Sequence, residues 1–194
     1  MAEIRDEHVE WRVVDRLREI LEKLPDTSND VTLTYSLFST ILCWTCQRMR
    51  ANDHAGAIWK ALSGEKAADA DWGLLDQITP TESSAGVAPL SDLPASRLLI
   101  ALRNATAHGD DRKVKPLHIA NGRGADRRLV GFALSVDLFE NGQKHRSEEP
   151  RWGRWSMPLT SMDMRRIGMN LAARFCDEFG PDAQQEATRH VLVA

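Results

Sequence analysis

The sequence is poor in cysteine and has no long apolar run. Three of its 194 residues are cysteines, and this odd count argues against a framework of disulfides. No apolar stretch approaches the length of a membrane-spanning helix. The charged start "MAEIRDEHVEW" also lacks the apolar core of a secretion signal. These absences predict a cytoplasmic protein with no membrane partner.

The chain has little net charge. Its formal net charge is -3, with 42% hydrophobic and 27% charged residues, values that are typical of a soluble globular protein. The length suits one hydrophobic core, so we expect a single domain over residues 1–194. Since the bulk charge does not indicate a nucleic-acid partner, any basic surface must be local. The sequence also has no phosphate-binding glycine loop and no serine-nucleophile elbow.

Two cysteines form the motif "CWTC" at residues 43–46, a spacing found in redox pairs and in halves of zinc sites. Its flanks, "LFSTILCWTCQRM", have the pattern of a continuous apolar helix rather than the strand-to-helix context of a redox motif. A zinc site needs a second ligand pair, but Cys176 stands alone and the histidines show no paired spacing (His54, His118, His145, His190). We therefore expect core cysteines and no metal or cofactor, with a dithiol protein as a weaker alternative.

Apolar residues at helical spacing predict that much of the chain is helical. The expected helices cover residues 8–24, 31–50, 93–108 and 160–179, with one or two short helices around 56–62 and 65–78. The mostly apolar 31–50 helix is expected to be the central, buried one. Residues 79–92 form a loop by composition. Ser91 or Asp92 is expected to cap the next helix, with Pro94 in its first turn and Gly109 as its end.

Between residues 114 and 158 the apolar pattern changes from helical to alternating. Phe132, Leu134, Val136 and Leu138 fall on one side of a strand, and "ENGQ" contains an Asn-Gly turn signal. We expect two or three antiparallel strands here. The predicted fold class is therefore mainly α: an up-and-down helical bundle with a small antiparallel β insertion at about 114–158, before the last helix.

The stretch "LRNATAHGD", residues 102–110, places Arg103, Asn104 and His108 near the end of the 93–108 helix. A neutral imidazole near pH 7 can take a proton from a hydroxyl and later return one to a leaving oxygen. An arginine beside it can hold a phosphate and stabilise charge in the transition state. On RNA, this pair is enough to activate the ribose 2′-hydroxyl against the adjacent phosphate. Asn104 could orient the histidine or a phosphate oxygen.

Spacing alone does not establish this site. Arg103 and His108 are five residues apart, so on an ideal helix their side chains diverge by about 140°, whereas Asn104 and His108 share a face. The two side chains could still meet if His108 already lies outside the helix, or if a second copy of the chain across a dimer axis supplies one of them. The bland alternative is that His108 is a cationic cap of the helix end. Arg112 and His118, six residues apart, show that nearly the same spacing also arises by chance.

The residues of "LRNATAHGD" resemble the signature of the HEPN superfamily (higher eukaryotes and prokaryotes nucleotide-binding). The family pattern is an arginine, a polar residue that is often asparagine, three further residues and a histidine, at a helix end in an all-α bundle. Arg103, Asn104 and His108 fill these positions. The "HGD" ending is similar to that of one group of small bacterial HEPN proteins.

The resemblance implies a homodimer with a composite active site and metal-independent endoribonuclease activity that leaves a 2′,3′-cyclic phosphate. It also implies a role in toxin–antitoxin or anti-phage defence, with an antitoxin or defence-system protein as partner. Many family members are instead inactive modules that bind RNA, a nucleotide or a protein, and this is the alternative function. Asp110 stands where some HEPN toxins carry a tyrosine that their partner modifies, so we do not expect control by that route. The β segment is also larger than a minimal HEPN bundle needs.

Two further groups are weaker candidates for substrate binding. Asp110, Arg112, Lys113 and Lys115 follow the motif directly, and the basic ones could attract a phosphate, although a solvated loop is the simpler interpretation. In "KHRSEEPRWGRW", Arg151, Trp152 and Arg154, with Trp155, could stack on bases and contact phosphates. The competing interpretation, which we favour, is a strand pair whose tryptophans pack against the helices.

Overall fold

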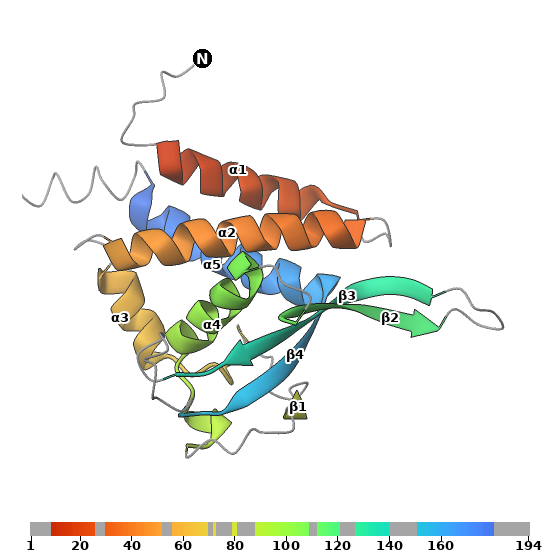
Figure 1. The fold of residues 1–194 in the computed structure, drawn as a ribbon. Coiled ribbons are helices and arrows are strands. Elements are labelled where there is room, and N and C mark those ends of the chain that lie inside the picture. The colour runs from red at the N-terminus through yellow and green to blue at the C-terminus, as the bar shows by residue number, and fades with distance from the viewer. Residues whose placement is uncertain are drawn as a thin grey trace, which may run out of the picture.

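Figure 1 shows the computed structural model of the chain, which describes residues 9–25, 30–51, 56–69, 72, 79–80, 88–108, 112–120, 127–139 and 151–180. Its helices are α1 (Val9–Lys23), α2 (Val31–Ala51), α3 (Gly56–Gly64), α4 (Ala95–His108) and α5 (Ser161–Phe179), with a 3₁₀ turn, η4, at Leu90–Asp92. Its strands are β1 (Thr79–Pro80), β2 (Val114–Ala120), β3 (Arg127–Asp137) and β4 (Arg154–Thr160).

The fold is mixed α/β, so the expectation of a mainly α, up-and-down bundle with a β insertion is wrong. The strands form one antiparallel sheet in the order β1-β4-β3-β2, and α2, α4 and α5 contact it (Figure 1). The rings of Tyr35 on α2 and Phe132 on β3 lie 4.5 Å apart between centroids. Leu134 belongs to the same buried cluster as Leu102 of α4. The sheet is a layer of the core, because its apolar face must be covered and the helices cover it.

The helices expected at 8–24, 31–50, 56–62, 93–108 and 160–179 are confirmed, with small shifts of their ends. The helix expected at 65–78 is wrong where the structure describes it, since residues 65–69 form turns and a bridge to Pro94. The backbone N–H of Ala67 donates to Leu93 at 2.8 Å, and that of Ala95 donates to Glu65 at 2.9 Å. This pairing satisfies the backbone groups that a helix would otherwise have satisfied.

The helix that is buried on nearly all sides is α4. The helix expected to be central and buried, α2, is central, because it contacts α1, α3, α4, α5 and β3, but one of its faces is exposed. Leu98, Leu99 and Leu102 of α4 are buried, whereas Leu33 and Trp44 of α2 are 45% and 37% exposed. Contacts with α2, α3 and β3 surround α4. A helix with apolar residues on most of its circumference must lie inside the molecule.

The start of α4 also differs from the expectation. Ser91 and Asp92 lie in η4 and do not cap α4. The helix begins at Ala95, directly after Pro94, whose carbonyl oxygen accepts a hydrogen bond from the backbone N–H of Leu98 at 3.2 Å.

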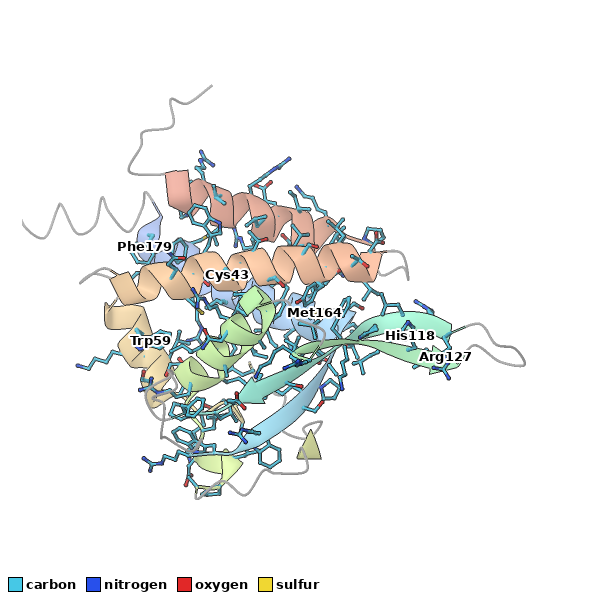
Figure 2. The ribbon with its side chains drawn as sticks, in the orientation of Figure 1. Cys43, Trp59, His118, Arg127, Met164 and Phe179 are labelled. Carbon is cyan, nitrogen blue, oxygen red and sulfur yellow. The ribbon has the colours of Figure 1, made fainter. Side chains whose placement is uncertain are left out.

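The antiparallel strands expected between 114 and 158 are confirmed as β2, β3 and β4. Leu134, Val136 and Leu138 alternate into the core, as their period predicts. The loop expected at 79–92 also contributes β1, which pairs with β4. The predicted Asn-Gly turn at 140–143 lies outside the described residues. The β2–β3 hairpin extends past the helices, with His118 and Arg127 near its free end (Figures 1 and 2).

Candidate functional site

The last two turns of α4 carry the residues of the predicted site. Leu102 and Ala105 are buried and Thr106 is nearly so, which holds this end of the helix in the core. Arg103 and Asn104 are half-buried, and Ala107 is exposed. The C-terminal end of the helix therefore brings polar residues to the surface, as Arg97 near its start also does. The described part of the helix extends to His108, and Gly109, its expected end, lies outside the described residues.

Arg103 and Asn104 contact each other. The guanidinium Nη1 of Arg103 donates to Oδ1 of Asn104 at 3.0 Å, and the hydroxyl of Thr106 donates to the backbone oxygen of Arg103 at 3.0 Å. An amide oxygen that accepts from a guanidinium restricts the rotation of the long arginine side chain. The carbonyl of Asn104 is therefore oriented toward Arg103, a role that the sequence did not predict.

His108 is the last residue of α4, and its side chain lies outside the described part of the structure. Because the backbone is helical through residues 95–108, the five-residue offset from Arg103 keeps its angular separation of about 140°. Asn104 lies one turn before His108 on the same face. One copy of the helix thus joins Arg103 to Asn104, while the histidine position faces a different direction from Arg103.

Two of the weaker candidates meet on the sheet. Nζ of Lys113 lies 3.1 Å from Asp137, and Nε of Arg154 lies 3.3 Å from the other oxygen of that carboxylate. These two cations belong to separate groups in the sequence, and Asp137 was not among the predicted site residues. The signal that joins them is the strand register, which pairs Asp137 with Arg154. Only the paired sheet reveals that register.

The other weaker candidates have different surroundings. Trp152 is 5% exposed, so the interpretation that it packs is confirmed and base stacking by this ring is not supported. The guanidinium of Arg151 lies 5.2 Å from the centre of that ring and is exposed. Arg112 and Lys115 are exposed. Asp110 lies outside the described residues.

The cysteines are core residues of helices. Cys43 is half-buried, while Cys46 and Cys176 are buried, and the thiol of Cys46 contacts the backbone oxygen of Leu99. Burial raises the pKa of the Cys176 thiol to about 11. The burial of Cys46 within α2 counts against a dithiol function, because thiol chemistry requires access. Within the described residues, no group of three or more histidine, cysteine or acidic side chains could hold a metal ion.

The structure also contains a polar cluster that sequence reasoning missed. Glu65 accepts from Arg174 of α5 at 2.5 Å and from the indole N–H of Trp72 at 3.1 Å. Arg174 in turn donates to Asn170 at 3.1 Å. Burial raises the pKa of Glu65, but the hydrogen bonds from Arg174 and Trp72 outweigh it and leave this pKa below its usual value. The cluster ties the segment after α3 to α5.

The described helices include none that is both long and apolar enough to cross a membrane. In comparison with known proteins, no family model, no curated protein and no solved structure matches this chain.

Proposed function

We propose that this chain is a cytoplasmic, metal-independent endoribonuclease of the HEPN type. The observation that supports this function is the end of α4, where Arg103 is held by Asn104 at 3.0 Å and His108 follows Asn104 by one turn. Arg103, which could bind a phosphate, and His108, which could transfer a proton, thus both belong to the end of α4 that reaches the surface. The proposal depends on the residues of this motif and does not require the chain to fold as a helical bundle.

The proposed reaction is internal attack on the RNA backbone. His108 acts as general base or acid: it takes the proton of the 2′-hydroxyl or gives one to the leaving 5′-oxygen. The 2′-oxygen bonds to phosphorus as the bond to the 5′-oxygen breaks, which leaves a 2′,3′-cyclic phosphate. Arg103 binds the phosphate and stabilises the charge of the transition state. Asn104 holds Arg103 in place.

A homodimer is the proposed active form, because two copies of α4 could combine the arginine of one chain with the histidine of the other. Its support is the exposed face of α2, which we call the α2 stripe (Thr32, Leu33, Ser36, Thr40, Trp44 and Gln47). No charged residue occurs between Asp30 and Arg48. The hydroxyls of Ser36 and Thr40 donate to backbone oxygens of their own helix at 2.9 and 2.8 Å. These two hydroxyls therefore keep their hydrogen bonds when the stripe is covered.

Replacing His108 tests the reaction directly. We expect His108→Ala to lower RNA cleavage by about 10²–10⁴-fold, the usual effect of removing a general acid–base group, while EDTA leaves the wild type active. His118→Ala is the matched control, since His118 is exposed on β2. The readout is cleavage of labelled RNA together with the terminal phosphate of the product. Cleavage by His108→Ala at the rate of the control variant would contradict the assignment.

The second candidate is an inactive RNA-, nucleotide- or protein-binding adaptor, with a defence-system protein or antitoxin as a possible partner. The observation that favours it is the divergence of residues 103 and 108 on one regular helix. RNA that is retarded by the purified wild type but never cut, in the presence or absence of metal ions, would favour the adaptor over the enzyme.

A further inference from the structure

The positive charge of this chain is concentrated in the stretch that forms most of the sheet. Residues 112–160 contain ten basic and five acidic residues, whereas the other 145 residues contain fifteen basic and twenty-three acidic ones. Within the described part of this stretch, Asp137 is the single acidic side chain against seven basic ones. The protein has a formal net charge of -3, so the stretch forms a local positive region on a negative molecule.

The strand register places most of these cations on one face. Alternate residues of β3 and β4 pack with the helices, so the residues between them point to the opposite, outer face. Asp137 and Arg154 are paired on this outer face, and Asp137 contacts Lys113 there. Lys115 pairs with Ala133, and Arg128 pairs with Ile119, which lies on the same side of β2 as Lys115. We call Lys113, Lys115, Arg128 and Arg154 the basic sheet face.

The shape of this face suits an extended chain. Its middle carries the small residues Gly131, Ala133, Ser135 and Ser156, and the register places Leu117 and Pro158 beside them on the same face. Residues two apart on a strand are separated by about 6.6 Å, and neighbouring strands by about 4.8 Å. The cations are therefore spread over several strands instead of surrounding one point. This arrangement fits a polymer with a charge on every unit better than a single small anion.

We propose that the basic sheet face binds the sugar–phosphate backbone of RNA. β2 begins at Val114, six residues after His108 in the chain, and the reaction proposed for His108 acts on RNA. The choice of RNA among polyanions therefore rests on the proposed function. The described residues put no aromatic ring on this face, so binding occurs through phosphates and has little base preference.

The test measures binding without cleavage. The probe is a fluorescently labelled 2′-O-methyl RNA of mixed sequence, which has no free 2′-hydroxyl and cannot undergo the proposed reaction. The sheet variant is Lys115→Gln with Arg128→Gln, two exposed positions. The control is Lys23→Gln with Arg16→Gln on α1, where the side chains are 74% and 70% exposed. Both variants lose the same charge, and anisotropy is recorded over a series of KCl concentrations.

We expect the sheet variant to bind about tenfold more weakly than the wild type, with the control unchanged. The slope of log affinity against log salt should fall in magnitude by about 1.4, because each phosphate contact to a single strand contributes about 0.7. Equal weakening in both variants overturns the inference, since it indicates net charge alone. Binding to anionic lipid vesicles but not to the RNA probe also overturns it.

This inference and the proposed function fail in different ways. If His108→Ala cuts RNA normally while the sheet variant loses binding, the catalytic assignment fails and the RNA-binding face stands. If cleavage depends on His108 while the sheet variant binds the probe like the wild type, the basic sheet face does not bind RNA and the catalytic assignment of His108 is retained.

Discussion

At the scale of single residues, Asn104 decides how Arg103 is presented. The side chains of neighbouring helical residues normally point in different directions, yet here the guanidinium donates to the amide oxygen of the next residue at 3.0 Å. A long, flexible cation gains a defined position through this contact. Asn104 is therefore a positioning residue for Arg103.

We expect Asn104→Ala to lower kcat/KM for RNA by about tenfold, since hydrogen bonds to charged groups contribute about 1.5–3 kcal/mol. Arg103→Lys keeps the charge but loses the planar fork that Asn104 holds. The double variant should be no worse than Arg103→Lys alone, because Asn104 then has nothing left to position. Additive losses in this cycle would show that Asn104 acts independently of Arg103.

At the scale of elements, the cluster around Glu65 joins the segment after α3 to α5. Its carboxylate accepts from Arg174 at 2.5 Å and from Trp72 at 3.1 Å, and Trp72 is fully buried. The guanidinium of Arg174 lies 5.3 Å from the centre of the Trp72 ring. The backbone oxygen of Glu65 accepts a hydrogen bond from the backbone N–H of Ala95 at 2.9 Å, so the same residue also holds the start of α4.

Glu65→Gln should lower Tm by about 3 °C at neutral pH, as expected when a hydrogen bond to a charged group is weakened in a chain of this size. The pKa of Glu65 is lowered from its usual 4.5, so its charged form stabilises the fold above pH 4.5. This stability is lost as the pH falls through the lowered value. The Tm difference from wild type should therefore shrink in acid.

The control for this prediction is Glu19→Gln. Glu19 is 39% exposed and pairs with Arg16 and Lys23 on the surface of α1, where ion pairs contribute little. Thermal melts of both variants over a pH series provide the comparison. A Tm difference for Glu65→Gln that grows as the pH falls would contradict the assigned charge state.

At the scale of the whole molecule, the α2 stripe suits a second copy of the chain. An uncharged face meets its own copy without repulsion between like charges, as a two-fold interface requires. The stripe spans about 22 Å, with Leu33 and Trp44 toward its ends and the smaller Ser36 and Thr40 between them. Two antiparallel copies would place Leu33 against Trp44 of the second chain at both ends. Because a single helix pair is a small interface, we expect micromolar affinity.

Thr40→Glu places like charges near the axis of that dimer and should weaken association by at least about tenfold. Met162→Glu on α5 is the matched control, since Met162 is 68% exposed and lies off the stripe. Sedimentation velocity over a concentration series measures both. Cleavage per chain should rise with protein concentration through the same transition, because the proposed site is composite. A wild type that stays monomeric while it cuts RNA would rule out the composite site.

The sequence by itself determined the positions of α1, α2 and α5 and the span that contains the three longer strands, together with the helix end that carries Arg103, Asn104 and His108. Periodicity and turn residues are local signals, so a local pattern is enough for these features. Only the tertiary structure decided that the sheet is a layer of the core, that Asn104 holds Arg103, and that Asp137 joins Lys113 to Arg154. These features depend on strand register and on packing between distant segments, which short-range periodicity does not specify.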